Sequence, residues 1–125
     1  MRFMLLLPAP VEALEKCAVP DAAIVTAMRK YDEEMRKAGV LLSEEGLHPT
    51  SKGARIRVSG GKRIVTDGPF IETKEVIAGF WIIQVKSKEE AIEWAKRAPL
   101  PEGAVIEIRQ IFENQDFPPE LQKKA

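Results

Sequence analysis

The stretch Val76-Ile77-Ala78-Gly79-Phe80-Trp81-Ile82-Ile83-Gln84-Val85 decides the fold of this chain. Nine of its ten positions are apolar if Gly79 is counted, so an extended chain here carries hydrophobic side chains on both sides. A run of this kind is typical of a central strand that is covered on both faces. We therefore expect residues 76–85 to form the middle of a sheet.

The remaining elements are predicted outward from this strand. Residues 2–7 are a second apolar run and are predicted to form a strand. A helix is predicted between Asp21, its expected N-cap, and Gly39, its expected stop. Its apolar side chains fall on one stripe: Ile24, Met28, Tyr31 and Met35. Gly60-Gly61 predicts a two-residue hairpin turn. Further strands are predicted at 40–47, 54–59, 62–66 and 105–112, and one helical turn is predicted near 11–17. A second helix begins at residue 87 with a capping box. The side chains of this helix that face inward are Ala91, Trp94, Ala95 and Ala98.

This order is β-α-β-(hairpin)-β-α-β, which matches an α+β, ferredoxin-like plan with an extra hairpin. We expect one domain over residues 1–112 and a loosely ordered tail over 113–125. Two helices cover only one face of such a sheet, yet residues 3–7 and 76–85 are apolar on both. A second copy of the chain would cover the open face, so a homodimer is expected.

Composition excludes several classes of function. The 19 basic residues balance 19 acidic ones, so neither nucleic acid nor a membrane surface is an expected partner. Residues 2–7 are too short a run for a signal peptide or a membrane span, and the single Cys17 fits a reducing compartment, which makes the cytoplasm the expected location. One cysteine and one histidine cannot form a structural zinc site, and we expect neither a metal nor a cofactor.

The loop in residues 65–75 is the expected place for a functional site. In Asp67-Gly68-Pro69-Phe70, Gly68 can adopt a positive φ angle, Pro69 fixes its own φ, and Asp67 can accept hydrogen bonds from nearby amides. Phe70 adds a large apolar side chain that a turn does not need. A shaped loop that carries a carboxylate beside an apolar strand is suited to binding or catalysis.

Asp67 is the first candidate catalytic residue. Desolvation against Phe70 and the following strand would raise its pKa toward that of a general base. The alternative is that its carboxylate caps the amides of the turn, which would lower the pKa instead. His48, the only histidine, is the second candidate because a nearby carboxylate would orient its ring and raise its basicity; the alternative is a surface or structural histidine.

The candidate ligand-binding residues are Gly68, Phe70, Arg57 and Trp81. On the basic hairpin, Arg55, Arg57 and Arg63 are expected to share a face that holds a carboxylate or phosphate, unless they only keep an edge soluble. Trp81, with Tyr31, would line an aromatic cleft or belong to the core. The expected ligand is a small anionic or aromatic molecule.

The motif Asp67-Gly68-Pro69-Phe70 followed by Glu72-Thr73-Lys74-Glu75 resembles the signature of the DGPF family, a branch of the YCII-related proteins. Similarity extends over residues 2–112, including Gly46-Leu47 with Pro49, and Gly79-Phe80-Trp81. The resemblance implies a dimeric α+β barrel with a cleft in each protomer. It also implies a His–Asp pair, to which His48 and Asp67 correspond loosely, and an analogy to lyases and isomerases of small molecules.

Two hypotheses follow. In the first, the protein is a small-molecule-binding protein or a cofactor-free lyase or isomerase, with Asp67 and His48 as the acid/base groups and the basic hairpin attracting an anionic substrate. In the second, it is a non-catalytic ligand-sensing or protein-interaction module, for example one linked to transcription regulation.

Overall fold

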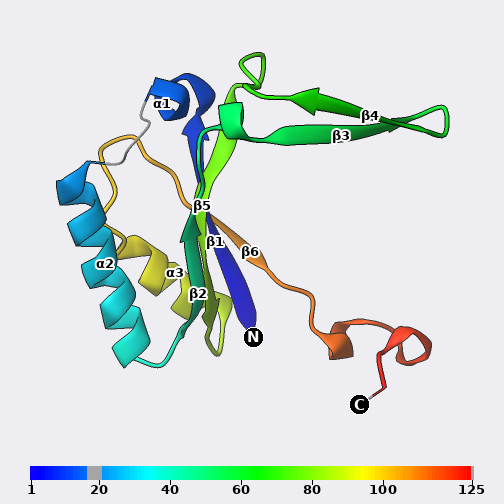
Figure 1. Ribbon diagram of the computed structural model, residues 1–125. Coiled ribbons are helices and arrows are strands. Elements are labelled where there is room, and N and C mark those ends of the chain that lie inside the picture. Colours follow the sequence, from blue (N-terminus) through cyan, green and yellow to red (C-terminus); the bar gives the residue numbers. More distant parts are fainter. Residues whose placement is uncertain (17–20, 125) are drawn as a thin grey trace.

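The computed structural model describes residues 1–16 and 21–124, and its main body is a four-stranded antiparallel sheet. The strand order is β2-β5-β1-β6, with β5 (Glu75–Gln84) and β1 (Arg2–Pro10) at the centre. The edge strands are β2 (Leu41–Gly46) and β6 (Glu107–Gln110). The prediction that residues 76–85 form a central strand is confirmed (Figure 1).

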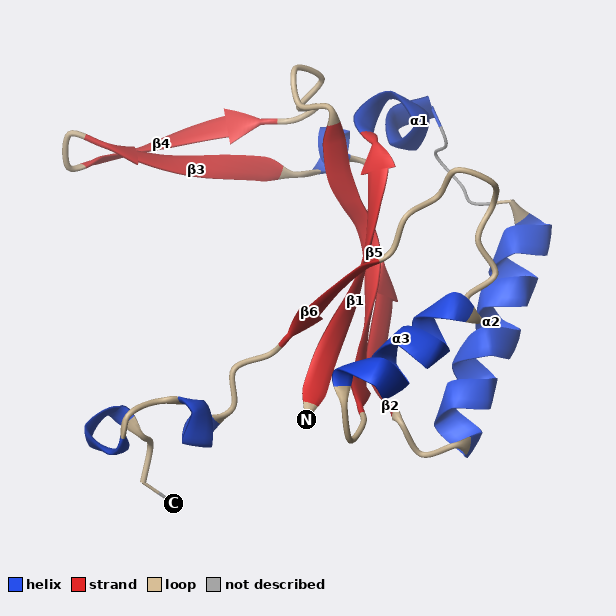
Figure 2. Ribbon diagram, turned by 180° about the vertical axis from the view of Figure 1, so that it is seen from behind, coloured by secondary structure: helices blue, strands red, loops and turns tan. Residues whose placement is uncertain are grey.

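Helices α2 (Ala22–Lys37) and α3 (Lys88–Lys96) cover one face of this sheet (Figure 2). Every second residue of the central strands points at them. The buried core therefore combines strand residues with helix residues: Phe3, Leu5, Trp81 and Ile83 from the strands, Tyr31, Met35 and Ala91 from the helices, and Val40 and Val85 beside them. The period-2 strand pattern and the helical stripe meet in one core, as the sequence predicts.

The predicted helix ends are confirmed. Asp21 accepts a hydrogen bond from the amide of Ala23 and Ser87 accepts one from that of Glu90, so both N-caps satisfy amides that lack a helical partner. Gly39 follows α2 with a φ of +74°, the left-handed conformation typical of a glycine stop. The predicted stripe of α2 is wrong at Ile24, which is 48% exposed because it lies in the first turn, away from the packed end of the helix.

Within residues 1–16 and 21–124, no helix lies on the opposite face of the sheet. Its central side chains are Met4 and Leu6 of β1, paired in register with Ile82 and Phe80 of β5, and all four are half-buried. The expectation of a sheet that is apolar on both faces is therefore confirmed for its central strands. The open side is the one toward which the hairpin and the C-terminal segment project (Figures 1 and 2).

The hairpin of β3 (Ala54–Ser59) and β4 (Lys62–Asp67) is a separate two-stranded sheet. Gly60 and Gly61 form its turn with φ angles of +56° and +77°, which confirms the predicted glycine turn. Arg55 and Arg57 share one face, as predicted. Arg63 does not, because its register partner is Val58, on the other face.

The C-terminal part of the chain differs most from expectation. Strand β6 ends at Gln110. The amide of Ile111 donates the last hydrogen bond of this pairing to the carbonyl of Arg2, the first residue of β1, so β1 offers no further partner. Phe112 is consequently 71% exposed and does not continue the inner face predicted for residues 105–112. Residues 113–124, expected to be a loosely ordered tail, contain the short 3₁₀ turns η2 (Asn114–Asp116) and η3 (Pro119–Leu121).

Two smaller elements complete the fold. Helix α1 (Val11–Lys16) follows β1 directly, where a single helical turn is predicted, although Cys17 and the connector that follows lie outside the described residues. The 3₁₀ turn η1 (Thr50–Lys52) precedes the hairpin. The architecture is α+β and compatible with a ferredoxin-like fold. None of the helices in the described residues is long and apolar enough to cross a membrane.

Candidate functional site

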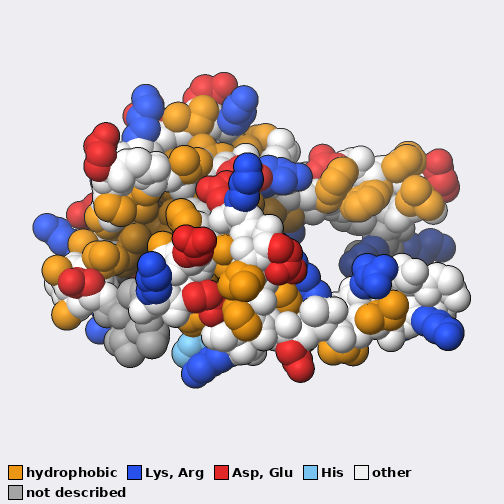
Figure 3. All heavy atoms as spheres, turned by 90° about the horizontal axis from the view of Figure 1, so that it is seen from above, with side chains coloured by type: hydrophobic (Ala, Val, Ile, Leu, Met, Phe, Trp, Pro, Cys, Tyr) orange, Lys and Arg blue, Asp and Glu red, His pale blue; other side chains and the backbone are white. Residues whose placement is uncertain are grey.

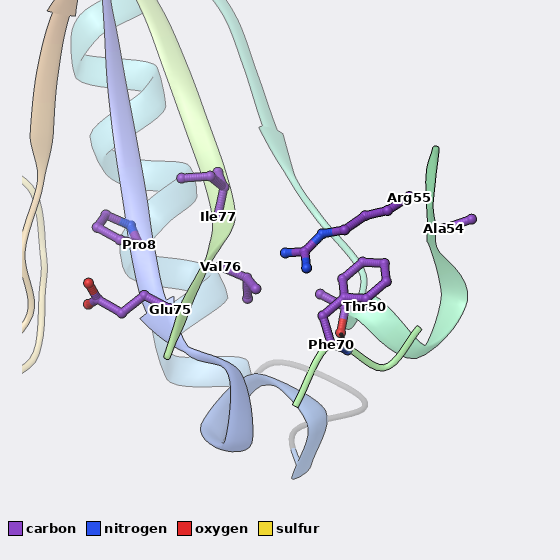
Figure 4. A pocket seen from close by; sticks show the side chains of 8 residues that line it. All are labelled: Pro8, Thr50, Ala54, Arg55, Phe70, Glu75, Val76 and Ile77. Atoms are coloured by element: carbon purple, nitrogen blue, oxygen red, sulfur yellow. Dashed lines mark hydrogen bonds between the residues drawn. The ribbon is translucent and has the colours of Figure 1, made fainter. Parts of the chain in front are cut away.

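A cavity of about 480 Å³ lies where the hairpin joins the sheet. Its wall on the sheet side comes from the last residues of β1 and the first residues of β5, and its other wall comes from η1, β3 and the loop before β5 (Figure 4). The lining residues are Pro8, Thr50, Ala54, Arg55, Phe70, Glu75, Val76 and Ile77. The site is thus assembled from three stretches that are far apart in the sequence: residue 8, residues 50–55 and residues 70–77.

Arg55 provides the positive charge of this cavity. Its guanidinium carbon lies 4.0 Å from the centre of the Phe70 ring, and Nη1 donates a hydrogen bond of 3.2 Å to Oγ1 of Thr73. Figure 4 shows the guanidinium directed from β3 toward Val76 and Ile77, with the Phe70 ring beside it. Among the ion pairs of residues 1–16 and 21–124, none includes Arg55. Its charge is therefore available to an anion.

The Asp67-Gly68-Pro69-Phe70 motif shapes this cavity by packing on η1. A Cβ at Gly68 would overlap the carbonyl oxygen of Thr50, so only glycine allows this close approach. The amide of Gly68 donates to the carbonyl of Gly53, and that of Phe70 to Oγ1 of Thr50. The expected positive φ at Gly68 is wrong, since this glycine is not among those with positive φ. The glycine is required by proximity instead, and the Gly68–Pro69 bond is cis.

Thr50 is held in turn by Glu15 of α1. One carboxylate oxygen accepts from the amide and hydroxyl of Thr50, at 2.6 and 2.8 Å, and the other accepts from the amide of Ser51, at 3.2 Å. Partial desolvation of the carboxylate opposes its ionisation, but the hydrogen bonds from Thr50 and Ser51 outweigh it and lower the pKa of Glu15. A charged Glu15 thus connects α1 through η1 to the Phe70 loop.

Neither of the two candidate catalytic residues lines this cavity. Asp67 ends β4 opposite Ala54, a lining residue, and its carboxylate is exposed and makes no hydrogen bond with the residues described. His48 is exposed in the segment between β2 and η1. In the single chain, the Asp67 carboxylate is therefore not buried, as the general-base hypothesis requires. It also does not cap the amides of the turn, as the alternative requires.

The candidate ligand-binding residues have separate positions. Phe70 lines the cavity, Gly68 supports it, and Arg57 lies two residues from Arg55 on the same face of the hairpin but farther out. Trp81 belongs to the core, where only 4% of it is exposed and its ring meets that of Tyr31 edge to face at 5.3 Å. Trp81 is therefore a core residue and does not line an aromatic cleft.

A polar cluster that sequence reasoning missed surrounds Trp81. Asp32 of α2 is 7% exposed and accepts a hydrogen bond of 2.6 Å from Nε1 of Trp81. Glu44 lies opposite Trp81 in β2, and its own burial, followed by repulsion from Asp32 and Glu45, raises the pKa of Glu44. Burial also raises the pKa of Tyr31 to about 12, and its hydroxyl donates to the carbonyl of Trp94 at 2.6 Å. The Asp32–Trp81 bond thus connects α2 to the sheet, and the Tyr31–Trp94 bond connects α2 to α3.

The remaining cavity residues were also missed. Thr50 and Pro8 belong to segments whose juxtaposition with the 65–75 loop no local pattern reveals. Glu75 is the last residue of that loop but was not named as a candidate. Within residues 1–16 and 21–124, no group of three or more His, Cys, Asp or Glu side chains is arranged to hold a metal ion.

The sheet, its two helices and the cavity at the root of an inserted hairpin define a small α+β domain with a ligand-sized site. Comparison with known families agrees: the model of the YCII-related domain matches residues 1–115, and the chain belongs to this family. A similar protein is an uncharacterised one from Rhizobium meliloti (strain 1021), 46% identical over 68 residues. That alignment covers 54% of this chain and 52% of the relative, so the chain matches about half of the relative's length.

Proposed function

We propose that this protein binds a small molecule that combines an anionic group, such as a carboxylate, with an apolar or aromatic part. The observation that carries the proposal is Arg55, a cation without an ion-pair partner among the described residues, directed into a cavity whose walls are mostly apolar. An anion there would form charge-assisted hydrogen bonds with the guanidinium. Its apolar part would contact Val76 and Ile77.

The size of the cavity supports this class of ligand. Sites for small molecules usually enclose 300–1,000 Å³ and combine apolar walls with a few polar groups, and a cavity of about 480 Å³ falls in this range. The Phe70 ring holds Arg55 from one side and Thr73 from another, so the cation is oriented before a ligand arrives.

The test is to compare Arg55→Gln with Arg57→Gln by calorimetry, using benzoate and hexanoate as probes and benzamide and hexanamide as their neutral counterparts. We expect carboxylates to bind better than amides, and Arg55→Gln to raise the carboxylate dissociation constant at least about tenfold. Arg57→Gln is the matched control, because it removes the same charge from the same face outside the cavity. Equal effects of both substitutions would contradict the proposal.

A cofactor-free acid/base step at this site is the finer form of the proposal. Asp67 is supported by its register with Ala54, which lines the cavity, and His48 by its place two residues before Thr50. Closure of the site around a ligand would bury Asp67 and make it a stronger base. The reaction class is proton abstraction followed by elimination or isomerisation.

We also propose that the protein acts as a homodimer through the open face of its sheet. Met4, Leu6, Phe80 and Ile82 form an apolar centre there that an identical face would cover. A non-catalytic sensing or interaction role is the second candidate function. It is favoured by the exposed apolar side chains of the hairpin, which are suited to contact another protein chain.

A further inference from the structure

The two faces of the β3–β4 hairpin differ in charge. Register partners in an antiparallel pair point to the same side, and one side consists of Arg55, Arg57, Ser59, Lys62, Ile64 and Thr66. This side, which we call the basic face, carries three cations and no carboxylate. The other side carries Arg63 and Asp67, one charge of each sign. The hairpin therefore collects its unbalanced positive charge on a single face.

The basic face begins at the wall of the cavity. Arg55 lines the cavity, and Arg57 is the next residue of β3 that points to the same side. Alternate residues of an antiparallel strand are about 7 Å apart, so the second cation starts one such step farther out than the first. Lys62, in register with Ser59, follows one step later. The cations thus form a row that starts at the ligand site and continues toward the tip of the hairpin.

The cations of this row are open to solvent and have no ion-pair partner in the part of the chain that the structure describes. Every residue of β3 and β4 is exposed, and the view from above shows the hairpin and the C-terminal segment as projections separated by a gap (Figure 3). Among the ion pairs of residues 1–16 and 21–124, none includes Arg55, Arg57 or Lys62. Like charges in a row repel one another, and an anion bound between them relieves this repulsion.

A role in solubility alone does not account for this sorting of charges. Charged side chains that protect a sheet edge from aggregation can have either sign. The whole chain has 19 basic and 19 acidic residues, yet the basic face has cations only. Since the positive field is confined to one short row, it suits a small ligand with separate anionic groups. A long polyanion such as a nucleic acid requires a wider cationic surface.

We propose that the ligand has two anionic groups, of which Arg55 binds the first and Arg57 binds the second. The inference rests on the proposed function and narrows its ligand to a molecule with one apolar end and two carboxylates. The apolar end lies against Val76 and Ile77, inside the cavity. The first carboxylate meets the guanidinium of Arg55, and the second lies just outside the cavity beside Arg57, because the planar guanidinium group matches the geometry of a carboxylate.

The two arginines contribute unequally to such a site. Arg55 is held by the Phe70 ring and by Thr73, so its guanidinium is oriented before the ligand arrives. Arg57 has neither an aromatic ring nor a carboxylate against it among the described residues, so its side chain loses freedom when it pairs with an anion. An exposed ion pair of this kind changes a binding constant by up to about fivefold. Arg57 therefore provides selectivity for a second carboxylate, whereas Arg55 provides most of the affinity.

Probes with the same apolar end and different carboxylates test the proposal. 3-Phenylpropanoate has one carboxylate, 2-benzylglutarate adds a second one on a flexible arm, and 2-benzylmalonate holds both on one carbon. In calorimetry with the full-length protein, we expect 2-benzylglutarate to bind about three- to fivefold more tightly than 3-phenylpropanoate. 2-Benzylmalonate has the same charge without the reach and should gain less. Arg57→Gln should remove the gain of 2-benzylglutarate and change the dissociation constant of 3-phenylpropanoate by less than about twofold.

Arg63→Gln is the matched control, because it removes the same charge from the opposite face of the hairpin, and it should change neither dissociation constant. Circular dichroism and Tm verify that the variants are folded. Equal losses in Arg57→Gln and Arg63→Gln would overturn the second carboxylate site, and so would 2-benzylglutarate binding no more tightly than 3-phenylpropanoate. If no probe binds, or if Arg55→Gln weakens none of them, the proposed function itself is refuted.

Discussion

Gly68 shows how one residue of the recognised motif acts through packing. The motif is arranged around the carbonyl of Thr50, which leaves no room for a side chain at position 68, and around the hydroxyl of Thr50, which accepts from the Phe70 amide. The function of the glycine is therefore to bring two backbones together, so that the Phe70 ring can lie under Arg55.

We expect Gly68→Ala to lower the free energy of unfolding by about 3 kcal/mol, because the new methyl group must displace backbone atoms and no flexible side chain can move aside. Urea unfolding measures the change. Gly46→Ala is the control, since a Cβ there has no atom within 4 Å, and it should change the stability by less than about 1 kcal/mol. Equal losses in the two variants would refute the packing role of Gly68.

The sequence identified the right loop and two of the residues that line the cavity, Phe70 and Arg55. Phe70 was predicted to contact a ligand and lines the cavity. Pro8, Thr50 and Arg55 reach the same cavity from other segments, and their meeting depends on the sheet register and on η1. Asp32 was missed because a charged residue in a helix is usually solvated, whereas here Trp81 offers its indole N–H.

Among the elements, α1 and η1 are coupled by one carboxylate. Glu15 binds three donors of Thr50 and Ser51, so the short helix after β1 is tied to the turn that supports the Phe70 loop. Because these bonds favour the ionised form, the pKa of Glu15 is lowered in the folded protein. The stabilisation is present above the unfolded pKa of 4.5 and is lost as the pH falls through the lower, folded pKa.

Glu15→Gln should therefore lower Tm at pH 7 by about 2–5 °C, and the difference from the natural protein should shrink below about pH 4.5. Differential scanning calorimetry from pH 3 to pH 7 measures both effects. Glu12→Gln changes an exposed carboxylate on the same helix and should have no such effect. A difference from the natural protein that is independent of pH would argue against the ionised Glu15.

The elements themselves were largely predictable because their signals are local. Caps at Asp21 and Ser87, the Gly60-Gly61 turn and the alternation in β1 and β5 are each contained in a few neighbouring residues. The end of β6 was not predictable in this way. Its length depends on where β1 begins, and that is a property of the pairing between distant strands.

In a monomer, the apolar open face of the sheet stays in contact with water. The helices cover one side of the sheet, while Phe80 and Ile82 pair with Leu6 and Met4 on the other. Burial of such a face against an identical one releases water from both surfaces, a gain that grows with the apolar area removed. The sequence predicted this apolar face correctly, and the dimer inferred from it stays a prediction.

We expect Ile82→Glu to convert the dimer to monomers, with a dissociation constant raised at least about 100-fold, because two carboxylates would be buried across a two-fold axis. Light scattering after size-exclusion chromatography gives the mass directly. Ile24→Glu serves as the control for adding a glutamate to an exposed isoleucine. A natural protein of 14.0 kDa in solution would refute the dimer itself.

The hairpin is inserted between β2 and β5, two strands that are neighbours in the sheet. This inserted segment contributes Thr50, Ala54, Arg55 and Phe70 to the cavity, whereas Pro8, Val76 and Ile77 come from the central strands. A change within residues 47–74 would therefore alter the charged wall of the site and leave its apolar wall on the sheet in place. Relatives that differ in this segment would therefore differ in the polar group that they bind. An engineer could graft another hairpin at the same junction and retain the original framework.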